Sequence, residues 1–160
     1  MAVDMFLKLD GIKGESQDSK HKDEIDVLSW SWGVTQSGTM HTGGGGGSGK
    51  ASFSDMTLTK YIDSSSTSLL KACSTGDHIK EALLVVRKAG KDQQEYLKYT
   101  LTDCLVSSVS IGGSGGESRL TENISLNFAK FKVEYRPQNK DGTLGGVMPF
   151  TYSIEENQAS

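Results

Sequence analysis

The residues with the clearest potential for chemistry lie in a glycine-rich stretch in the first third of the chain. It reads Gly-Gly-Gly-Gly-Gly-Ser-Gly over residues 43–49, and Lys50 follows directly. The spacing G-x-x-x-x-G-K fits a phosphate-binding loop, in which backbone N–H groups and a lysine hold nucleotide phosphates. However, Ala51 stands where that motif requires a Ser or Thr hydroxyl for Mg²⁺, and residues 51–59 lack the apolar stripe of the helix that must follow. The stretch therefore predicts a long protruding loop rather than a nucleotide site.

Histidines and carboxylates form no catalytic or metal-binding motif. His21, His41 and His78 do not have the spacing of metal ligands and are expected to be solvated loop residues. Neither the G-x-S-x-G nor the H-E-x-x-H pattern occurs in the chain. Glu24 and Asp26 share one face of an expected strand, but such a pair is more often a solvated strand edge than an acid–base couple. The sequence thus predicts no enzyme, no cofactor and no metal.

Asp103 is the exceptional carboxylate, because strand alternation places it on the same face as Leu101 and Leu105. A carboxylate that points inward requires a partner, and Arg87 or Arg119 could supply the positive charge. A structural ion pair is the expected role, since such pairs are common in places where no catalysis occurs.

A strand that begins near residue 25 is expected to position the best candidates for a binding surface. Its residues alternate, so its side chains divide between two faces. The expected core face holds Leu28, Trp30 and Trp32, and the opposite, exposed face holds Val27, Ser29 and Ser31. The small, mildly polar exposed face suits a surface that lines a passage. The alternative is that the two indoles are exposed and form a platform for sugars.

Most of the remaining chain is also expected to form strands. They cover about residues 6–9, 82–87, 95–111, 120–135 and 147–154, separated by turns rich in Gly and Asp. Within the fourth of these, the apolar residues change parity near Ala129 and Lys130, which predicts a β-bulge that curls the sheet. Residues 155–160 are expected to be a flexible, frayed tail.

One short helix is expected from about Ser64 to Ser74, with Asp63 as its N-cap and Gly76 at its end. Its apolar stripe consists of Leu69, Leu70 and Cys73. The predicted fold class is mainly β: a small curled β-barrel or sandwich, one domain, with this helix packed at its side and a long Gly-rich loop.

Composition limits the partners. The 160 residues carry a formal net charge of −3 with Lys and Arg scattered, which argues against a nucleic-acid partner. No apolar run approaches the ~18 residues of a membrane helix. Asp4 and Lys8 interrupt the segment where a signal peptide would be apolar, so folding in the cytoplasm is expected. Cys73 and Cys104 are expected to be reduced, partly buried thiols.

Several stretches, taken in chain order, carry a resemblance to a known family. They are Met1 to Phe6, Lys13 to Ser16, Ile25 to Gly33, the glycine stretch, Thr59 to Asp63, Ala72 to Ser74, Arg87 to Gly90, Val106 to Ser110 and Leu120 to Asn123. Together they resemble the Hcp family, the haemolysin-coregulated tube proteins of bacterial type VI secretion. The resemblance covers nearly the whole chain up to about Tyr135.

The resemblance implies a β-barrel protomer that closes into a homo-hexameric ring, and rings that stack into a hollow tube. A contractile sheath drives this tube, with a spike protein at its tip, into a target cell, and small effector proteins travel in the lumen. Secretion without a cleaved signal peptide and without membrane insertion is implied as well.

Two sets of residues are assigned roles on this basis. Ring stacking is expected from Gly43, Gly44, Gly45, Gly46, Gly47, Ser48 and Gly49, and the lumen with its effectors is expected to contact Val27, Ser29 and Ser31. The main alternative is a secreted carbohydrate-binding β-sandwich that uses the tryptophans or Tyr61 on an exposed face, and nucleotide hydrolysis at the glycine stretch comes third.

Overall fold

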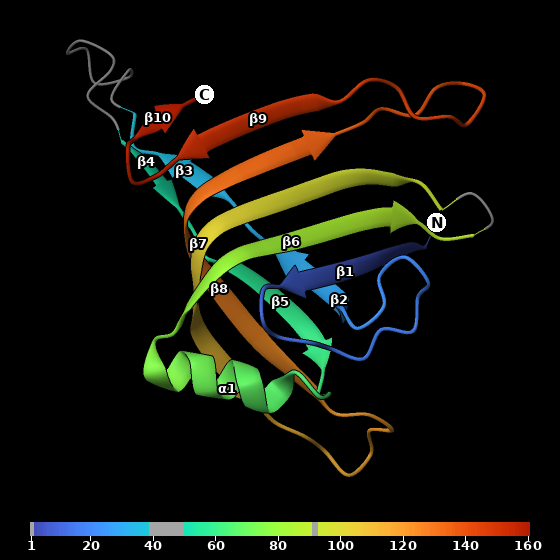
Figure 1. The fold of residues 1–160 in the computed structure, drawn as a ribbon, viewed down its shortest axis with the longest axis vertical. Helices are drawn as coiled ribbons and strands as arrows, with labels where there is room; N and C mark the ends of the chain where they lie inside the picture. The colour runs from blue at the N-terminus through green and yellow to red at the C-terminus, as the bar shows by residue number, and fades with distance from the viewer. Residues whose placement is uncertain (1, 39–49, 91–92) are drawn as a thin grey trace.

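The protein is described by a computed structural model that covers residues 2–38, 50–90 and 93–160. The elements are β1 (Val3–Leu9), β2 (Ile25–Ser31), β3 (Val34–Gln36), β4 (Ala51–Phe53), β5 (Met56–Tyr61), α1 (Ser66–Thr75), β6 (His78–Lys88), β7 (Glu95–Ile111), β8 (Thr121–Tyr135), β9 (Met148–Ser153) and β10 (Gln158–Ala159). Strands dominate, with α1 packed beside the sheet (Figure 1), so the predicted fold class is confirmed.

The main sheet closes on itself. Its strand order is β10-β9-β8-β5-β2-β1-β6-β7, and β7 pairs with β8 in addition. The six strands from β8 through β5, β2, β1 and β6 to β7 therefore form a closed barrel, while β9 and β10 continue the sheet outside it. Closure leaves few backbone groups at open strand edges, which stabilises an all-antiparallel sheet of this size.

The long strands bend, and this bend allows the sheet to close. In β8, Phe128 and Phe131 are both buried although they have opposite parity, so side chains change face at residues 129–130. Asp103 lies at the same level of β7 and has a φ of 54°, in the left-handed region. The predicted change of face is confirmed, but the β-bulge predicted near Ala129 and Lys130 is not present. The β7–β8 ladder keeps its register there, and its extra residue is Ser107, further along β7.

Asp103 does not form the inward ion pair that alternation predicted. Its left-handed backbone turns the side chain out of the barrel, and the residue is exposed. The two arginines proposed as partners have other contacts: Arg87 pairs with Asp18, and Arg119 lies 3.8 Å above the centre of the Tyr61 ring. The prediction was wrong because strand parity does not survive a residue with positive φ.

A second irregularity divides β2. The β2–β5 ladder shifts register between Val27 and Ser29, so Leu28 occupies a bulge. Val27 is only 7% exposed and belongs to the core, whereas Leu28 is 39% exposed. The assignment of Val27 to the exposed face and of Leu28 to the core is therefore wrong. Beyond the bulge the prediction holds, because Trp30 and Trp32 pack against the core.

Helix α1 begins two residues later than predicted and ends as expected. Gly76 caps its C-terminus with a φ of 69°, a conformation that glycine adopts without strain. The N-cap is Ser65, not Asp63, and the Asp63 carboxylate instead accepts a hydrogen bond from the Ser65 N–H at 2.9 Å. Leu69 is buried in the core as predicted, but Leu70 is 47% exposed, so its assignment to the apolar stripe was wrong.

The C-terminal residues are more ordered than the sequence suggested. A flexible, frayed tail was predicted over residues 155–160, whereas Gln158 and Ala159 form β10 against β9. The N–H of Ser160 also donates to the carbonyl oxygen of Thr151 at 3.0 Å.

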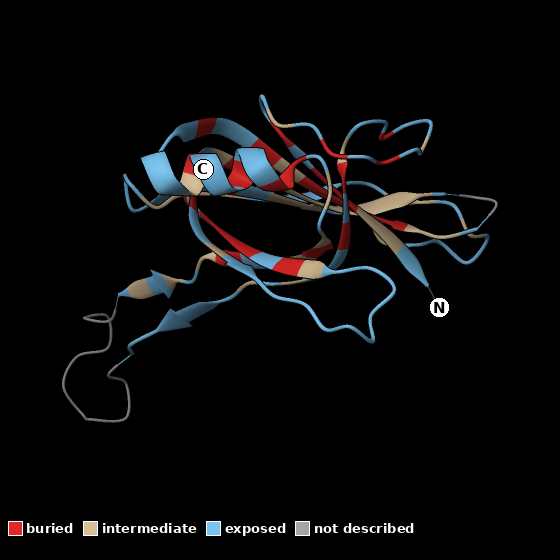
Figure 2. Cartoon of the chain, turned by 90° about the horizontal axis from the view of Figure 1, so that it is seen from below, coloured by how far each residue is buried: buried red, intermediate tan, exposed pale blue. Residues whose placement is uncertain are grey.

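Two short strands lie apart from the main sheet. β3 and β4 pair only with each other, in a two-stranded sheet. Figure 2 shows them projecting away from the barrel, at the base of the grey trace. The predicted stacking residues 43–49 fall in that trace and lie outside the described residues, as does His41.

Candidate functional site

One face of the sheet is covered with small hydroxyl and amide side chains. It spans β2, β5, β8 and β7, whose alternate residues Leu58, Ile124 and Val106 point into the core. Cross-strand pairing aligns the outward residues in two rows: Ser29, Thr59, Asn123 and Ser110 in the first, and Ser31, Thr57, Ser125 and Ser108 in the second. We refer to these eight residues as the hydroxyl face.

Hydrogen bonds along the rows hold the side chains of the hydroxyl face in place. The hydroxyls of Ser31 and Thr57 are 2.6 Å apart, and the Thr59 hydroxyl donates to Asn123 at 2.6 Å. The second row continues with a 2.5 Å contact between Ser108 and Ser125. None of the eight side chains carries a charge, and hydroxyls without a neighbouring base are weak nucleophiles. The face can therefore bind by hydrogen bonds. The Asp55 carboxylate is joined to it through Ser107, which donates to Asp55 at 2.6 Å and lies 2.7 Å from the Ser125 hydroxyl.

The predicted lumen residues fall partly on this face. Ser29 and Ser31 are exposed members of it, and Val27 is in the core instead. The sequence analysis did not identify the other six members of the hydroxyl face. The alternation of Met56 and Leu58 with Thr57 and Thr59 could have indicated the two members on β5. The pairing of β5 with β8 could not be seen, because it joins residues more than 50 positions apart, such as Thr57 and Ser125.

His21 is not the solvated loop residue that was predicted. It is 6% exposed, and its ring stacks on Phe6 with centroids 4.4 Å apart. Its Nδ1 lies 2.9 Å from Glu24 and its Nε2 lies 2.9 Å from Glu95. This arrangement attaches the loop between β1 and β2 to β7, and the distant partner Glu95 explains why no local pattern revealed it. His78, by contrast, is exposed as predicted, although it begins strand β6 and does not lie in a loop.

A second ion cluster, around Arg87 of β6, also holds the loop between β1 and β2 in place. The Arg87 side chain is 2% exposed, and its guanidinium donates two hydrogen bonds to the Asp18 carboxylate, one of them at 3.0 Å, with Asp4 at 3.4 Å. These hydrogen bonds from Arg87 lower the pKa of Asp18 from 3.8 to about 2. The loop thus covers Phe6 and Arg87 on the outside of the barrel.

The lowered pKa of Asp18 makes its contribution to stability depend on pH. The contribution is complete above the ordinary pKa of 3.8 and is lost as pH falls toward about 2, because the folded protein then binds the proton less readily than the unfolded chain. We expect Asp18→Asn to lower the free energy of unfolding by about 2 kcal/mol at pH 7. Chemical denaturation at pH 7 and near pH 2 measures the effect, and the two proteins should converge at the acid end. An equal difference at both pH values would contradict this account.

The best-buried charges lie beneath the start of α1. The Lys60 ammonium is 2.5 Å from Glu122 and 3.0 Å from Asp63, and the side chains of Lys60 and Glu122 are 1% and 0% exposed. Ser66 also donates to Glu122 at 2.8 Å. One oxygen of Glu122, Oε2, is buried without a hydrogen-bond partner in the described part of the chain. The cluster ties β5, β8 and α1 together and is structural in character.

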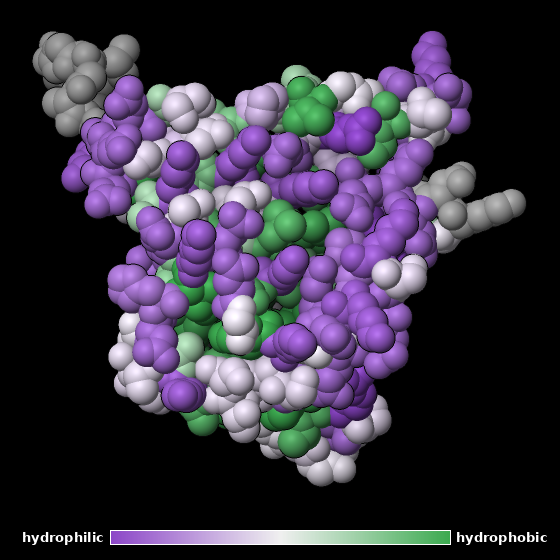
Figure 3. All heavy atoms as spheres, in the orientation of Figure 1, coloured by the Kyte–Doolittle hydropathy of each residue, from purple (hydrophilic) through white to green (hydrophobic). Residues whose placement is uncertain are grey.

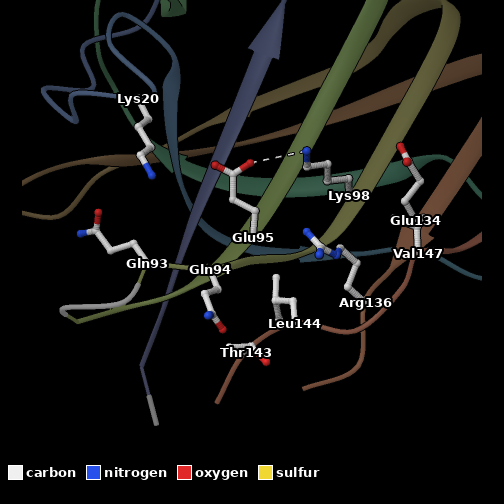
Figure 4. Close-up of a pocket in the computed structure, with 10 residues that line it drawn as sticks. All are labelled: Lys20, Gln93, Gln94, Glu95, Lys98, Glu134, Arg136, Thr143, Leu144 and Val147. Atoms are coloured by element: carbon white, nitrogen blue, oxygen red, sulfur yellow. Dashed lines mark ion pairs between the residues drawn. The ribbon is translucent and has the colours of Figure 1, made fainter. Parts of the chain in front are cut away.

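A polar groove of about 590 Å³ opens at the end of the barrel where β7 begins and β8 ends. Figure 4 shows Lys20, Lys98 and Arg136 around it, with Glu95 and Lys98 joined in an ion pair at 3.6 Å. The Arg136 guanidinium donates to the carbonyl oxygen of Gly145 at 3.0 Å. The groove has mixed charge, and the hydroxyl of Thr143 in its lining donates to the Asp141 carboxylate at 2.6 Å.

The described ranges were also searched for metal-binding groups, reactive thiols and membrane-spanning helices. No group of three or more His, Cys, Asp or Glu residues there could hold a metal ion. Both cysteines are free, and burial raises the pKa of the Cys104 thiol to about 12, so that thiol stays protonated. No helix in this part of the protein has the length and apolar character needed to cross a membrane.

Comparison with known proteins decides the family. The family model described as "Type VI secretion system effector, Hcp" matches residues 6–135. The chain belongs to the Hcp family. It is 57% identical over 159 residues to protein hcp1 of Pseudomonas aeruginosa, with 98% of each chain covered.

Solved Hcp structures agree in fold. Hcp1 from Salmonella typhimurium is 45% identical with a TM-score of 0.83, and each chain is covered completely. A structure described as a type six secretion system protein is 34% identical with a TM-score of 0.93, and the match covers 99% of this chain and 100% of the other. The resemblance drawn from the sequence is therefore confirmed, and this Hcp is a component of type VI secretion.

Proposed function

We propose that this Hcp is a single-domain structural subunit of the type VI inner tube, in which hexameric rings stack around a hollow lumen that carries small effector proteins. Its partners would be further copies of itself, the effectors, the tip spike protein and the contractile sheath. A structural role is supported by the exposed surfaces described above, which offer rows of hydrogen-bonded uncharged side chains and a projecting hairpin.

The hydroxyl face carries this proposal. A lumen that transports different effectors needs a surface that stays hydrated and interacts weakly with many partners. Small uncharged hydroxyls fulfil this requirement, because hydrogen bonds exchanged with water contribute little net free energy to each contact. Apolar side chains would retain cargo, and clustered charges would select for one sign. We therefore assign the hydroxyl face, including Ser29 and Ser31, to the wall of the lumen.

We expect Ser31→Gln to reduce cargo retention without disturbing the ring. Ser31 is exposed, and exposed substitutions usually change stability by less than about 0.5 kcal/mol. The longer amide would crowd the lumen and break the Ser31–Thr57 hydrogen bond. Co-purification of effectors with the ring measures retention, and native mass spectrometry measures ring size.

The matched control is Ser74→Gln, an exposed serine on α1 and away from the hydroxyl face. It should leave both ring size and effector retention unchanged. If Ser31→Gln and Ser74→Gln retained effectors equally well, the hydroxyl face would not be the lumen wall.

Ring stacking is assigned to the β3–β4 hairpin and the glycine stretch between its strands. An isolated hairpin with three residues in each strand is marginally stable in water, so a projecting hairpin of this kind suits a docking role. Electron microscopy of the purified protein tests this part of the proposal. Tubes that persist after residues 43–47 are deleted would contradict it.

We also propose that the protein folds in the cytoplasm and is secreted without a cleaved signal peptide. The support is that the first strand, β1, is an integral part of the barrel, where it pairs with β6 over its whole length. Removal of these residues during export would open the sheet.

The sugar-binding alternative loses its main support. Trp32 contacts Phe131 edge-on at 4.8 Å, and Trp30 contacts Tyr99 edge-on at 5.0 Å. Both indoles pack against the core, so they do not form the flat exposed platform that a sugar would need.

A further inference from the structure

A single carboxylate, that of Asp55, lies at one end of the hydroxyl face. Asp55 comes directly before β5 and has the same parity as Thr57, so it extends the outward row of that strand. Its Oδ2 accepts a hydrogen bond from the Ser107 hydroxyl at 2.6 Å, and its Oδ1 accepts one from the Asn127 amide at 2.9 Å. Two neutral donors from two other strands thus fix the position of this charge at the edge of the face.

The irregularity in β7 makes the contact with Ser107 possible. The β7–β8 ladder shifts register between Val106 and Ser108, so Ser107 is the extra residue. In a regular strand, Ser107 and Ser108 would point to opposite faces. Here both hydroxyls reach Ser125, at 2.7 Å and 2.5 Å, and Ser107 is exposed. The bulge therefore aims the Ser107 hydroxyl at Asp55 on the outer surface.

The charge of Asp55 is not balanced by a cation among the described residues. None of the ion pairs formed there includes Asp55, although the residue is half-buried. A carboxylate has about four acceptor positions, two on each oxygen. Ser107 and Asn127 occupy one position on each oxygen, so one remains free on each. Two parallel N–H groups of a guanidinium match this arrangement.

A cavity of about 290 Å³ opens beside this carboxylate. Its apolar lining residues are Phe53, Phe128 and Ile154, and Asp55 and Asn127 line it as well. Strongly hydrophilic residues cover much of the side of the protein that Figure 3 shows, and cations line the groove of Figure 4. In the described lining of the cavity, by contrast, Asp55 is the single charged residue. We refer to this site as the Asp55 cavity.

An arginine side chain has the features that complement the Asp55 cavity. Its methylene stem covers apolar surface while its charged end stays at the polar side. The planar guanidinium donates two hydrogen bonds to one carboxylate, and it is less strongly hydrated than an ammonium group. A lysine would bring the same charge, but only as a strongly hydrated point charge.

We propose that the Asp55 cavity binds arginine side chains of the effector proteins that travel in the tube. The inference rests on the proposed tube function and names the chemistry by which its cargo is selected. The hydroxyl face remains an uncharged surface of weak contacts, and Asp55 adds one point of preference at its edge. A single ion pair that is open to water contributes little free energy, so effectors are still released.

The test uses the full chain and a defined peptide probe. The probe is a short fluorescent peptide of Gly and Ser that contains three arginines, and the reference peptide has citrulline in their place, which keeps the shape and removes the charge. Wild-type protein should bind the arginine peptide about tenfold more tightly than the citrulline peptide, as a hydrogen bond between charged groups does. Asp55→Asn should abolish this difference. Fluorescence anisotropy measures both affinities.

Asp23→Asn is the matched control, because it removes an exposed carboxylate from the loop between β1 and β2. Asn also tolerates the positive φ of 63° at that position. The variant should bind the arginine peptide as wild type does. Raising the ionic strength from about 0.05 M to about 0.5 M should reduce the difference between wild type and Asp55→Asn, since salt screens charges near the surface. A merely structural role of Asp55 would leave that difference unchanged.

Each further result decides between stated alternatives. Equal binding of the arginine peptide by wild type and folded Asp55→Asn, or an equal loss in Asp23→Asn, would overturn the Asp55 cavity as a site and leave the tube function intact. A lysine peptide that binds as tightly as the arginine peptide would overturn the choice of arginine. Asp55→Ser replaces Asp55→Asn if circular dichroism shows that the latter does not fold. A wild-type protein that forms no ring and retains no effector would instead overturn the proposed function.

Discussion

Lys60→Met is expected to lower the free energy of unfolding by about 3–5 kcal/mol, because it leaves a buried carboxylate without its cation. Lys60 and Glu122 are both inaccessible to water, and the distance between their charged atoms is 2.5 Å. Oε2 of Glu122 lacks a hydrogen-bond partner in the described structure, and after the change Oε1 would keep the hydrogen bond from Ser66 but lose the ammonium. Equilibrium denaturation in urea at pH 7 measures the change.

The double variant Lys60→Met with Glu122→Leu separates two contributions to the loss of stability: the uncompensated charge of Glu122 and the lost hydrogen bonds of the ion pair. If the cost arises from an uncompensated buried charge, the double variant should regain most of the stability, since apolar groups of similar volume can replace a buried ion pair. A double variant as unstable as Lys60→Met would show that the pair contributes mainly through its hydrogen bonds to Asp63 and Ser66.

Trp32→Ala is expected to lower the free energy of unfolding by about 3 kcal/mol, the scale of a large aromatic truncation. The indole contacts Phe131 at 4.8 Å, Tyr99 at 5.8 Å and Phe128 at 6.0 Å between ring centres. Its Nε1–H also donates to the carbonyl oxygen of Ser54 at 2.8 Å. Truncation would leave a cavity among these rings and an unpaired carbonyl group.

Leu28→Ala is the matched control, because simple alternation assigns Leu28 to the same face as Trp32. The bulge exposes Leu28, so the isolated subunit should lose less than about 1 kcal/mol. Thermal melting of both variants, at a concentration low enough to disfavour rings, makes the comparison. Similar losses for the two variants would mean that β2 has no change of face.

The period-2 pattern determined most of the strands but not the direction of every side chain. The observed β7, Glu95–Ile111, coincides with the predicted strand, and Ala82 to Arg87 lie within β6 as expected. Alternation is a local property of the extended backbone, so it can be read from a short window of sequence. A bulge or a residue with positive φ reverses the alternation at one point, so a single alternating pattern assigns the side chains on one side of that point to the wrong face.

Leu28, Val27 and Asp103 were misassigned for this reason. Nothing in the residue types of Val27 and Leu28 indicates the bulge between β2 and β5, and Asp103 was misassigned because of its positive φ. The helix end at Gly76 was predicted correctly, since a glycine that closes a helix acts within one turn of the chain.

The sequence by itself thus determined the family, the strand content, the short helix and the absence of a catalytic motif, all of which depend on local pattern or on ordered matches along the chain. Only the tertiary structure decided that His21 is buried between Glu24 and Glu95, that Lys60 meets Glu122, and that Ser31 belongs to a face of eight small polar residues. The partners in each case come from different strands or loops. Their proximity is fixed by how the barrel closes, and closure depends on the summed burial of the whole core rather than on any one segment.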